Sequence, residues 1–426
     1  MKDLSPDSPH PRLRALQISP VSEDSEEWFH FHDRSGITPD VRVPREFGPL
    51  LAQLDGTRSI EEILREVQTD DPARLRLWAE EMIAELDEFY LLDSPRFAAR
   101  QSEIDAQCSS QNNATGVRAA AFAGLSYPEN PDQLRDFLEP KLARGLKNLP
   151  PPLYDAKNVL GIVTPHIDFT RGGHLEAASY RPLLENVRAT GKPFDTLVIL
   201  GIAHQGISYP FCATAKDFAT PFGLAECDQE WLKDLRFQIG PKLTREQKSH
   251  EDEHSIEFSA VFCQMFDELK TSKIVPILCG GFWHSLQSGE LPENAEPEVG
   301  AFIEALREVT QNHQAQGKKI GFIASVDGAH VGTQFGDDTS ITPTILQKIR
   351  DEDAAWISAM ESGDRARFHA HFTKNENALN VDAHPALYTL MKAFPRLRAQ
   401  KLDYDQAFSA GANIVVSFAS LALFEP

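Results

Sequence analysis

The stretch VLGIVTPHIDFTRGG, residues 159–173, contains the pattern that decides the fold. Its first six residues form a short apolar run with β-branched side chains, which is typical of a strand buried in a parallel sheet. Pro165 ends this run, and His166 and Asp168 follow at once. Because ligand sites in open α/β sheets lie just beyond the carboxyl ends of the strands, the stretch predicts an α/β domain with a functional loop after Thr164.

The same rhythm continues along most of the chain, where short apolar runs alternate with longer amphipathic segments. The predicted strands are 159–164, 196–200, 274–278, 320–325 and 414–418, and the predicted helices include 174–189, 255–269, 298–311, 351–362 and 385–393. This alternation predicts an α/β fold in which helices flank a buried sheet.

Histidines follow several of these predicted strands. His204 lies in GIAHQ, Asp327 and His330 lie in VDGAH, and His384 lies in VDAHP just before a predicted helix. Neutral imidazole is the commonest side-chain ligand of iron, copper and zinc, although any single histidine is better explained by a hydrogen bond to a backbone carbonyl. Taken together, the loops predict one shared metal or catalytic site.

The segment HEDEH, residues 250–254, matches the H-E-x-x-H pattern of zinc peptidases. The preceding segment TREQKS is wholly polar, so we expect a solvated loop that ends where an apolar-faced helix begins at Ser255. A zinc peptidase built on His250 and His254 is therefore the weaker interpretation. The other is that His254 and Glu257, three residues apart on one helical face, point into the shared cleft.

Changes in composition predict four regions. Residues 1–27 carry prolines and acidic residues without apolar periodicity, which predicts a disordered tail. Residues 28–93 have the apolar spacing of a small domain, and residues 94–114 are polar as in a linker. The α/β domain then occupies residues 115–426.

The charge and cysteine content exclude several classes of protein. A surplus of 63 Asp and Glu over 42 Lys and Arg gives a net charge of −21, which repels nucleic acids and anionic membranes. The longest apolar run, 414–424, is too short to span a bilayer. Five cysteines without a CxxC pair, in a chain whose start lacks an apolar signal core, indicate a cytoplasmic protein.

The ordered motifs PHIDFTRGG, GIAHQ, EDEHSIE, SVDGAH and DAHP resemble those of the Memo family over residues 118–426. Bacterial members of that family are called AmmeMemoRadiSam system protein B. The resemblance implies an α/β fold similar to class III extradiol dioxygenases, which hold non-haem Fe(II). In addition, residues 28–93 resemble the winged-helix domains of the PqqD-like type, which bind leader peptides or partner enzymes.

The resemblance also implies a set of metal ligands. Family members bind iron or copper through two histidines, which match His166 and His204, and a cysteine, which matches Val381. Valine cannot bind a metal, so a neighbour must replace it. We expect His384 as the third ligand because the His-Pro pair is itself a family feature, with Asp382 as the alternative that would complete a two-histidine, one-carboxylate site.

The remaining matched residues are expected to support the chemistry. Asp327 and His330 match one family segment, and His254 and Glu257 match another. A carboxylate can orient a ligating imidazole, and a histidine near an activated oxygen species can carry protons. We therefore expect catalytic roles for His254, Asp327 and His330.

The resulting functional hypothesis is a Memo-like redox protein with a dioxygenase-like pocket, associated with a radical-SAM enzyme. Fe(II) is the expected ion, and copper or zinc also suit such ligands. Whether the protein turns over a small molecule as an oxidoreductase is left open. The alternatives are a non-catalytic module that binds a peptide or partner protein, and the zinc peptidase described above.

Overall fold

The computed structural model describes residues 10–14, 16–23, 26–33, 37–39, 41–65, 71–110, 116–337 and 339–426. The chain divides into two units, Met1–Asn113 and Ala114–Pro426. Each unit is described by itself.

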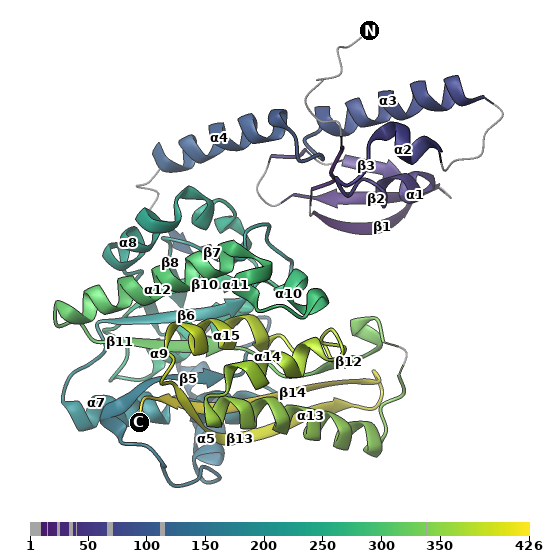
Figure 1. The fold of residues 1–426 in the computed structure, drawn as a ribbon. Coiled ribbons are helices and arrows are strands. Elements are labelled where there is room, and N and C mark those ends of the chain that lie inside the picture. The colour runs from purple at the N-terminus through teal and green to yellow at the C-terminus, as the bar shows by residue number, and fades with distance from the viewer. Residues whose placement is uncertain are drawn as a thin grey trace. The chain divides into compact units, whose positions relative to one another are not determined.

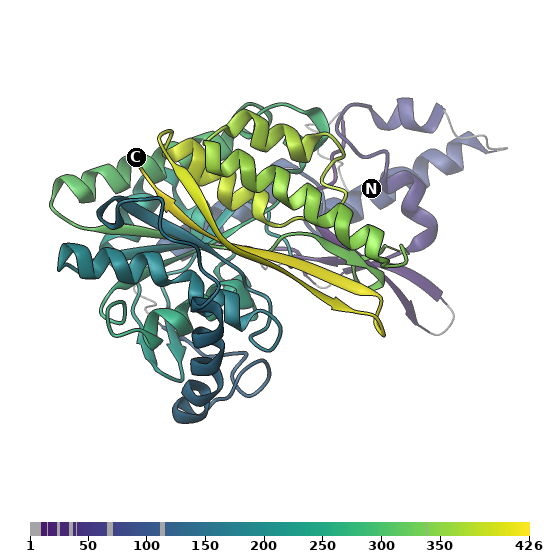
Figure 2. The ribbon, with the colours of Figure 1, turned by 90° about the horizontal axis from the view of Figure 1, so that it is seen from below.

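The larger unit is built on a mixed eight-stranded sheet (Figure 1). Its order is β12 (His330–Gly332), β14 (Ile414–Phe424), β5 (Val159–Thr164), β11 (Ile320–Ser325), β6 (Thr196–Ile202), β10 (Lys273–Cys279) and β7 (Phe211–Ala213), with β13 (Arg398–Ser409) paired to β14. The four central strands β5, β11, β6 and β10 are parallel. Strands β13 and β14 form a long antiparallel hairpin, which Figure 2 shows in yellow.

Helices cover both faces of this sheet. One face carries α8 (Gln229–Ile239), α12 (Pro297–Ala315), α13 (Pro343–Ser362), α14 (Arg365–Thr373) and α15 (Ala383–Ala393). The other carries α5 (Pro131–Leu146), α6 (Gly173–Ser179), α7 (Arg181–Thr190) and α9 (His254–Met265). The predicted helix 174–189 is thus two helices, since Pro182 in the first turn of α7 has no N–H to continue the helical ladder.

The apolar run of β6 shows why the sheet is buried on both sides. Val198 and Leu200 pack into the core under α8 and α12 to α15, whereas Leu197 and Ile199 pack into the core under α5 to α7 and α9. Successive strand residues point to opposite faces, so a strand covered on both faces needs a continuous apolar run. The predicted α/β sheet flanked by helices is therefore confirmed.

Short elements complete the larger unit. They are β4 (Val117–Arg118), β8 (Asp217–Thr220) and β9 (Gly223–Ala225), which form a small sheet, with η2 (Ala156–Asn158), η3 (Pro241–Thr244), η4 (Gln247–His250), η5 (Thr333–Phe335), α10 (Trp283–Ser288) and α11 (Pro292–Ala295).

The smaller unit combines an antiparallel sheet with helices around its own apolar core. Its elements are β1 (Gln17–Glu23), β2 (Glu26–His32), β3 (Val41–Pro44), η1 (Arg45–Phe47), α1 (Gly48–Leu51), α2 (Ile60–Arg65), α3 (Pro72–Glu88) and α4 (Pro95–Ser110). Its assignment to the PqqD-like winged-helix type stays a prediction.

Two segments of the smaller unit differ from expectation. Strand β1 lies within 1–27, which we expected to be a disordered tail. An edge strand needs little apolar periodicity of its own, because the neighbouring strand supplies its hydrogen-bonding partners. Here Ile18 pairs with Phe31 of β2. Helix α4 lies within the expected linker 94–114, where the Ser94 hydroxyl accepts from the Phe97 N–H at 3.2 Å and Phe97 is buried. Residues 1–9 lie outside the described residues.

Among the described residues, every helix is too short or too polar to cross a bilayer.

Gly201 near the end of β6 allows α9 to approach the sheet closely. A Cβ atom at this position would lie 2.6 Å from Ser255 Oγ and 2.7 Å from Ile256 Cγ1.

We therefore expect Gly201→Ala to destabilise the protein by about 1–3 kcal/mol, as overpacking in a core does. Urea unfolding measures this loss. Gly411→Ala, where a Cβ would meet no atom within 4 Å, is the control, and equal stability of the two variants would contradict the expectation.

Candidate metal centre

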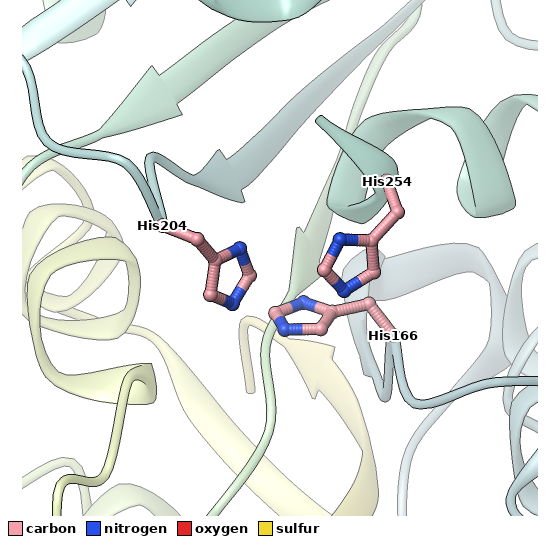
Figure 3. Close-up of side chains that lie close together, drawn as sticks. All are labelled: His166, His204 and His254. Atoms are coloured by element: carbon pink, nitrogen blue, oxygen red, sulfur yellow. The ribbon is translucent and has the colours of Figure 1, made fainter. Parts of the chain in front are cut away.

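Three histidines from separate parts of the chain meet at the carboxyl edge of the sheet. His166 follows β5, His204 follows β6, and His254 begins α9. Their ring centroids lie 4.8 to 5.1 Å apart, and one ring nitrogen of each lies within 4.8 Å of the other two. Figure 3 shows the three rings facing one another. This three-histidine cluster could hold a metal ion.

The backbone explains how these side chains meet. Strands β5 and β6 both pair in parallel with β11, so their carboxyl ends lie at the same edge. Helix α9 is joined to that edge by Ser255, whose hydroxyl accepts from the Ile202 N–H at 3.0 Å and donates to the Ile202 carbonyl at 3.2 Å. His254 is thereby held beside His204.

Glu253 orients two of the three imidazoles. One of its carboxylate oxygens lies 3.0 Å from His204 Nδ1 and 3.2 Å from His254 Nδ1, and the other accepts from the His204 backbone N–H at 3.1 Å. Burial raises the pKa of Glu253, but the two imidazoles outweigh it and hold this pKa well below its usual range. A carboxylate that accepts from Nδ1–H fixes the tautomer in which Nε2 is free to bind a metal.

His166 is oriented in the same sense by a backbone group. Its Nδ1 lies 2.9 Å from the Ser325 carbonyl oxygen, which can only accept, so Nδ1 carries the proton. Its Nε2 is buried and, among the described residues, has no hydrogen-bond partner. An unpaired lone pair buried beside two other imidazoles fits a bound cation.

Three carboxylates make the surroundings of the cluster negative. Besides Glu253, Asp382 Oδ2 lies 3.1 Å from His166 Nε2, and Asp327 Oδ1 accepts from the His166 backbone N–H at 3.0 Å. Burial lowers the pKa of His204, but Asp382 and Glu253 raise it to about 10. The same negative potential favours a cation at the cluster.

His384, which we expected to be a metal ligand, lies in a different environment. Its Nε2 is 3.0 Å from His369 Nδ1, and its ring packs against Phe368 and Phe372. Burial lowers its pKa to about 3. Because α15 begins at Ala383, its first turn directs His384 toward α14, and the three-histidine group is completed by His254 instead.

The other predicted site residues are placed as follows. Asp327 contacts His166 as described, and His330 lies on the wall of a cavity, with its Nδ1 3.1 Å from the Asn380 carbonyl oxygen. The catalytic roles of His254, Asp327 and His330 stay predictions. Glu257 does not point into the cleft. It is buried in an ion pair with Arg118 and accepts from Tyr127 and from the Phe122 N–H.

The HEDEH segment is only in part the solvated loop that we expected, because Glu251 and Asp252 are exposed whereas His250 and Glu253 are buried. His250 ends η4 and is buried, with Nε2 3.1 Å from the Cys212 carbonyl oxygen. Because α9 begins only at His254, the two histidines do not share one helical face, as a peptidase helix of this type requires. His250 and Glu253 are the buried members of this segment, and Glu253 supports the three-histidine cluster.

A cavity of about 400 Å³ adjoins the cluster. His204 and Asp382 lie on its wall at the cluster end, and Phe282, Trp283 and Phe335 contribute apolar surface. Of the described residues, neither Lys nor Arg lines it. The cavity thus suits a small, largely apolar molecule whose polar atoms reach the cluster end.

One prediction from this site concerns Glu253. We expect Glu253→Gln to weaken binding of Zn²⁺ or Co²⁺ by about 10–100-fold, as loss of a carboxylate partner of a ligating histidine does. The reason is that the glutamine amide N–H would face an imidazole Nδ1–H, and two donors cannot form a hydrogen bond. Competition with a chromophoric chelator measures the affinity. The control is Glu251→Gln, which changes an exposed carboxylate two residues away that pairs with Lys216. An equal loss of metal affinity in both variants would refute the orienting role of Glu253.

The second prediction concerns pH and His250. Burial lowers the pKa of His250 to about 3 in the folded protein, whereas an unfolded histidine titrates near 6.5. The unfolded chain thus binds more protons between these values, and stability falls as the pH drops below about 6.5. At pH 5 the loss from His250 is about 2 kcal/mol. Urea unfolding at pH 7 and pH 5 should show that the free energy of unfolding falls less for His250→Gln than for the wild-type protein. An equal fall in the two proteins would contradict this.

Comparison with known proteins places the larger unit among related chains. Residues 118–422 match the family model described as Memo-like protein. A MEMO1 family protein of Aquifex aeolicus is 26% identical over 424 residues, covering 97% of this chain and 100% of that relative. One from Thermus thermophilus is 25% identical over 328 residues, covering 76% and 88%. One from Sulfurisphaera tokodaii is 31% identical over 221 residues, covering 50% and 70%.

Proposed function

The chain belongs to the Memo-like protein family, and we propose that it is a metal-dependent redox protein. In this proposal His166, His204 and His254 hold the ion, which is Fe(II), with copper or zinc as alternatives. When bound, iron or copper supplies one-electron redox chemistry or oxygen activation. The observation that carries the proposal is the buried His166 Nε2, which has no hydrogen-bond partner among the described residues and lies beside two imidazoles whose Nδ1 atoms are held by Glu253.

The chain's own residues provide the rest of a reaction site. The cavity beside His204 has room for a small organic molecule and apolar walls to exclude water. His330 on its wall directs Nδ1 toward the Asn380 carbonyl oxygen, so Nε2 is the nitrogen that can accept a proton. These features support a dioxygenase-like oxidoreductase more than a peptidase.

Partners and cellular location form a separate part of the proposal. We propose an association with a radical-SAM enzyme, for which the smaller unit is the candidate docking element because β1 ends its three-stranded sheet and can add a further strand. Four cysteines, Cys212, Cys227, Cys263 and Cys279, are free and buried, which supports a cytoplasmic location. If the protein is only a binding module, His166→Ala should leave partner binding unchanged.

Metal analysis tests the central proposal. The full chain, purified anaerobically and supplied with Fe(II), should retain about one ion per chain after gel filtration, and His166→Ala should lose it because a ligand is removed. His284→Ala, which changes an exposed histidine outside the cluster, should retain it. Absence of iron and copper from the wild-type protein under these conditions would overturn the proposal.

A further inference from the structure

Asp382 has a carboxylate oxygen that faces two imidazoles of the three-histidine cluster. Asp382 Oδ2 is buried and, within the described part of the chain, has no hydrogen-bond partner. It lies 3.1 Å from His166 Nε2 and 3.7 Å from His204 Nε2. A buried carboxylate oxygen without a donor is costly unless a positive charge lies beside it.

The facing nitrogen of His166 does not satisfy this oxygen. The Ser325 carbonyl fixes the His166 proton on Nδ1, so Nε2 presents a lone pair to Asp382. The two atoms lie at ion-pair distance, yet among the described residues neither has a hydrogen-bond partner of good geometry. Two electron-pair donors turned toward the same small space are stabilised by a cation that both can bind.

We propose that Asp382 is a direct carboxylate ligand of the ion held by His166 and His204. This inference rests on the proposed function, because it concerns the same ion. It replaces His384 as the residue that compensates for Val381, whose side chain has no donor atom.

The chain holds Asp382 in place from both sides. Its other oxygen, Oδ1, accepts from the Asp327 N–H at 2.7 Å, and Asp327 in turn binds the His166 N–H. Before it, the Asn377 amide clamps the backbone of Val381, accepting from its N–H at 3.1 Å and donating to its carbonyl at 2.8 Å. A ligand fixed in this way loses little conformational freedom when an ion binds.

The added carboxylate determines which ions suit the site. Oxygen and imidazole ligands favour Fe(II), Mn(II), Co(II) or Zn(II), whereas Cu(I) prefers sulfur. Two histidines and one carboxylate are the ligand set of oxygen-activating Fe(II) proteins. His254 can then serve either as a fourth ligand or as a proton carrier, with Glu253 behind it in both cases.

Cobalt substitution in the full chain tests the assignment without relying on activity. Asp382→Asn keeps an oxygen that can accept from the Asp327 N–H. We expect this variant to weaken Co²⁺ binding by more than about 100-fold, which exceeds the loss caused by removing a supporting partner of a ligand. We also expect it to alter the visible d–d spectrum. Asp382→Cys should add a near-ultraviolet thiolate-to-cobalt charge-transfer band. His384→Cys is the matched control, and we expect no such band from it.

The outcomes separate the two proposals. If Asp382→Asn binds Co²⁺ within about threefold of wild type with an unchanged d–d spectrum, the Asp382 assignment is overturned, and metal binding by the histidines stands. A charge-transfer band in His384→Cys but not in Asp382→Cys would also overturn it. If the wild-type chain binds neither Co²⁺ nor Fe(II), both proposals fail. Circular dichroism of each variant verifies that the comparison is made between folded proteins.

Discussion

The candidate centre depends on the contact of one buried carboxylate, Glu253, with His204 and His254. It joins the loop after β6 to the first turn of α9, two segments about 50 residues apart in sequence. Since both imidazoles turn Nδ1 toward Glu253, Nε2 is the nitrogen that each leaves available for an ion. Without this carboxylate the three rings would still be neighbours, but nothing described in the fold would set the tautomers of His204 and His254 in this way.

The sheet and its helices supply the rigidity that such a contact needs. The parallel strands β5, β11 and β6 end at one edge, and the continuous apolar run of β6 is packed from both faces. Loops that leave a strand buried in this way have little freedom in where they begin. Ser255 then ties α9 to the same edge, so that the elements behind the site are fixed before any ligand arrives.

Much of this arrangement was predictable from the sequence. The apolar runs identified the central strands, and because strand ends determine where loops start, His166 and His204 were recognisable as neighbours. The position of His384 away from the three-histidine cluster was not, since it depends on the residue at which α15 begins. Glu253 was missed because it follows two other acidic residues, a pattern typical of solvent-exposed segments. The signal available was its position just before an apolar helix, where a carboxylate caps the N-terminus.

The buried pair of Arg118 and Glu257 has a practical consequence for anyone dividing the molecule. Arg118 lies only five residues beyond Asn113, the last residue of the smaller unit, yet its guanidinium also donates to the carbonyls of His250 and Glu253 at 2.8 and 2.9 Å. A fragment cut just after Arg118 would leave the Glu257 carboxylate in the interior without its counter-charge, a defect that typically costs about 3–5 kcal/mol. The safe point of excision for an isolated larger unit therefore lies upstream of β4.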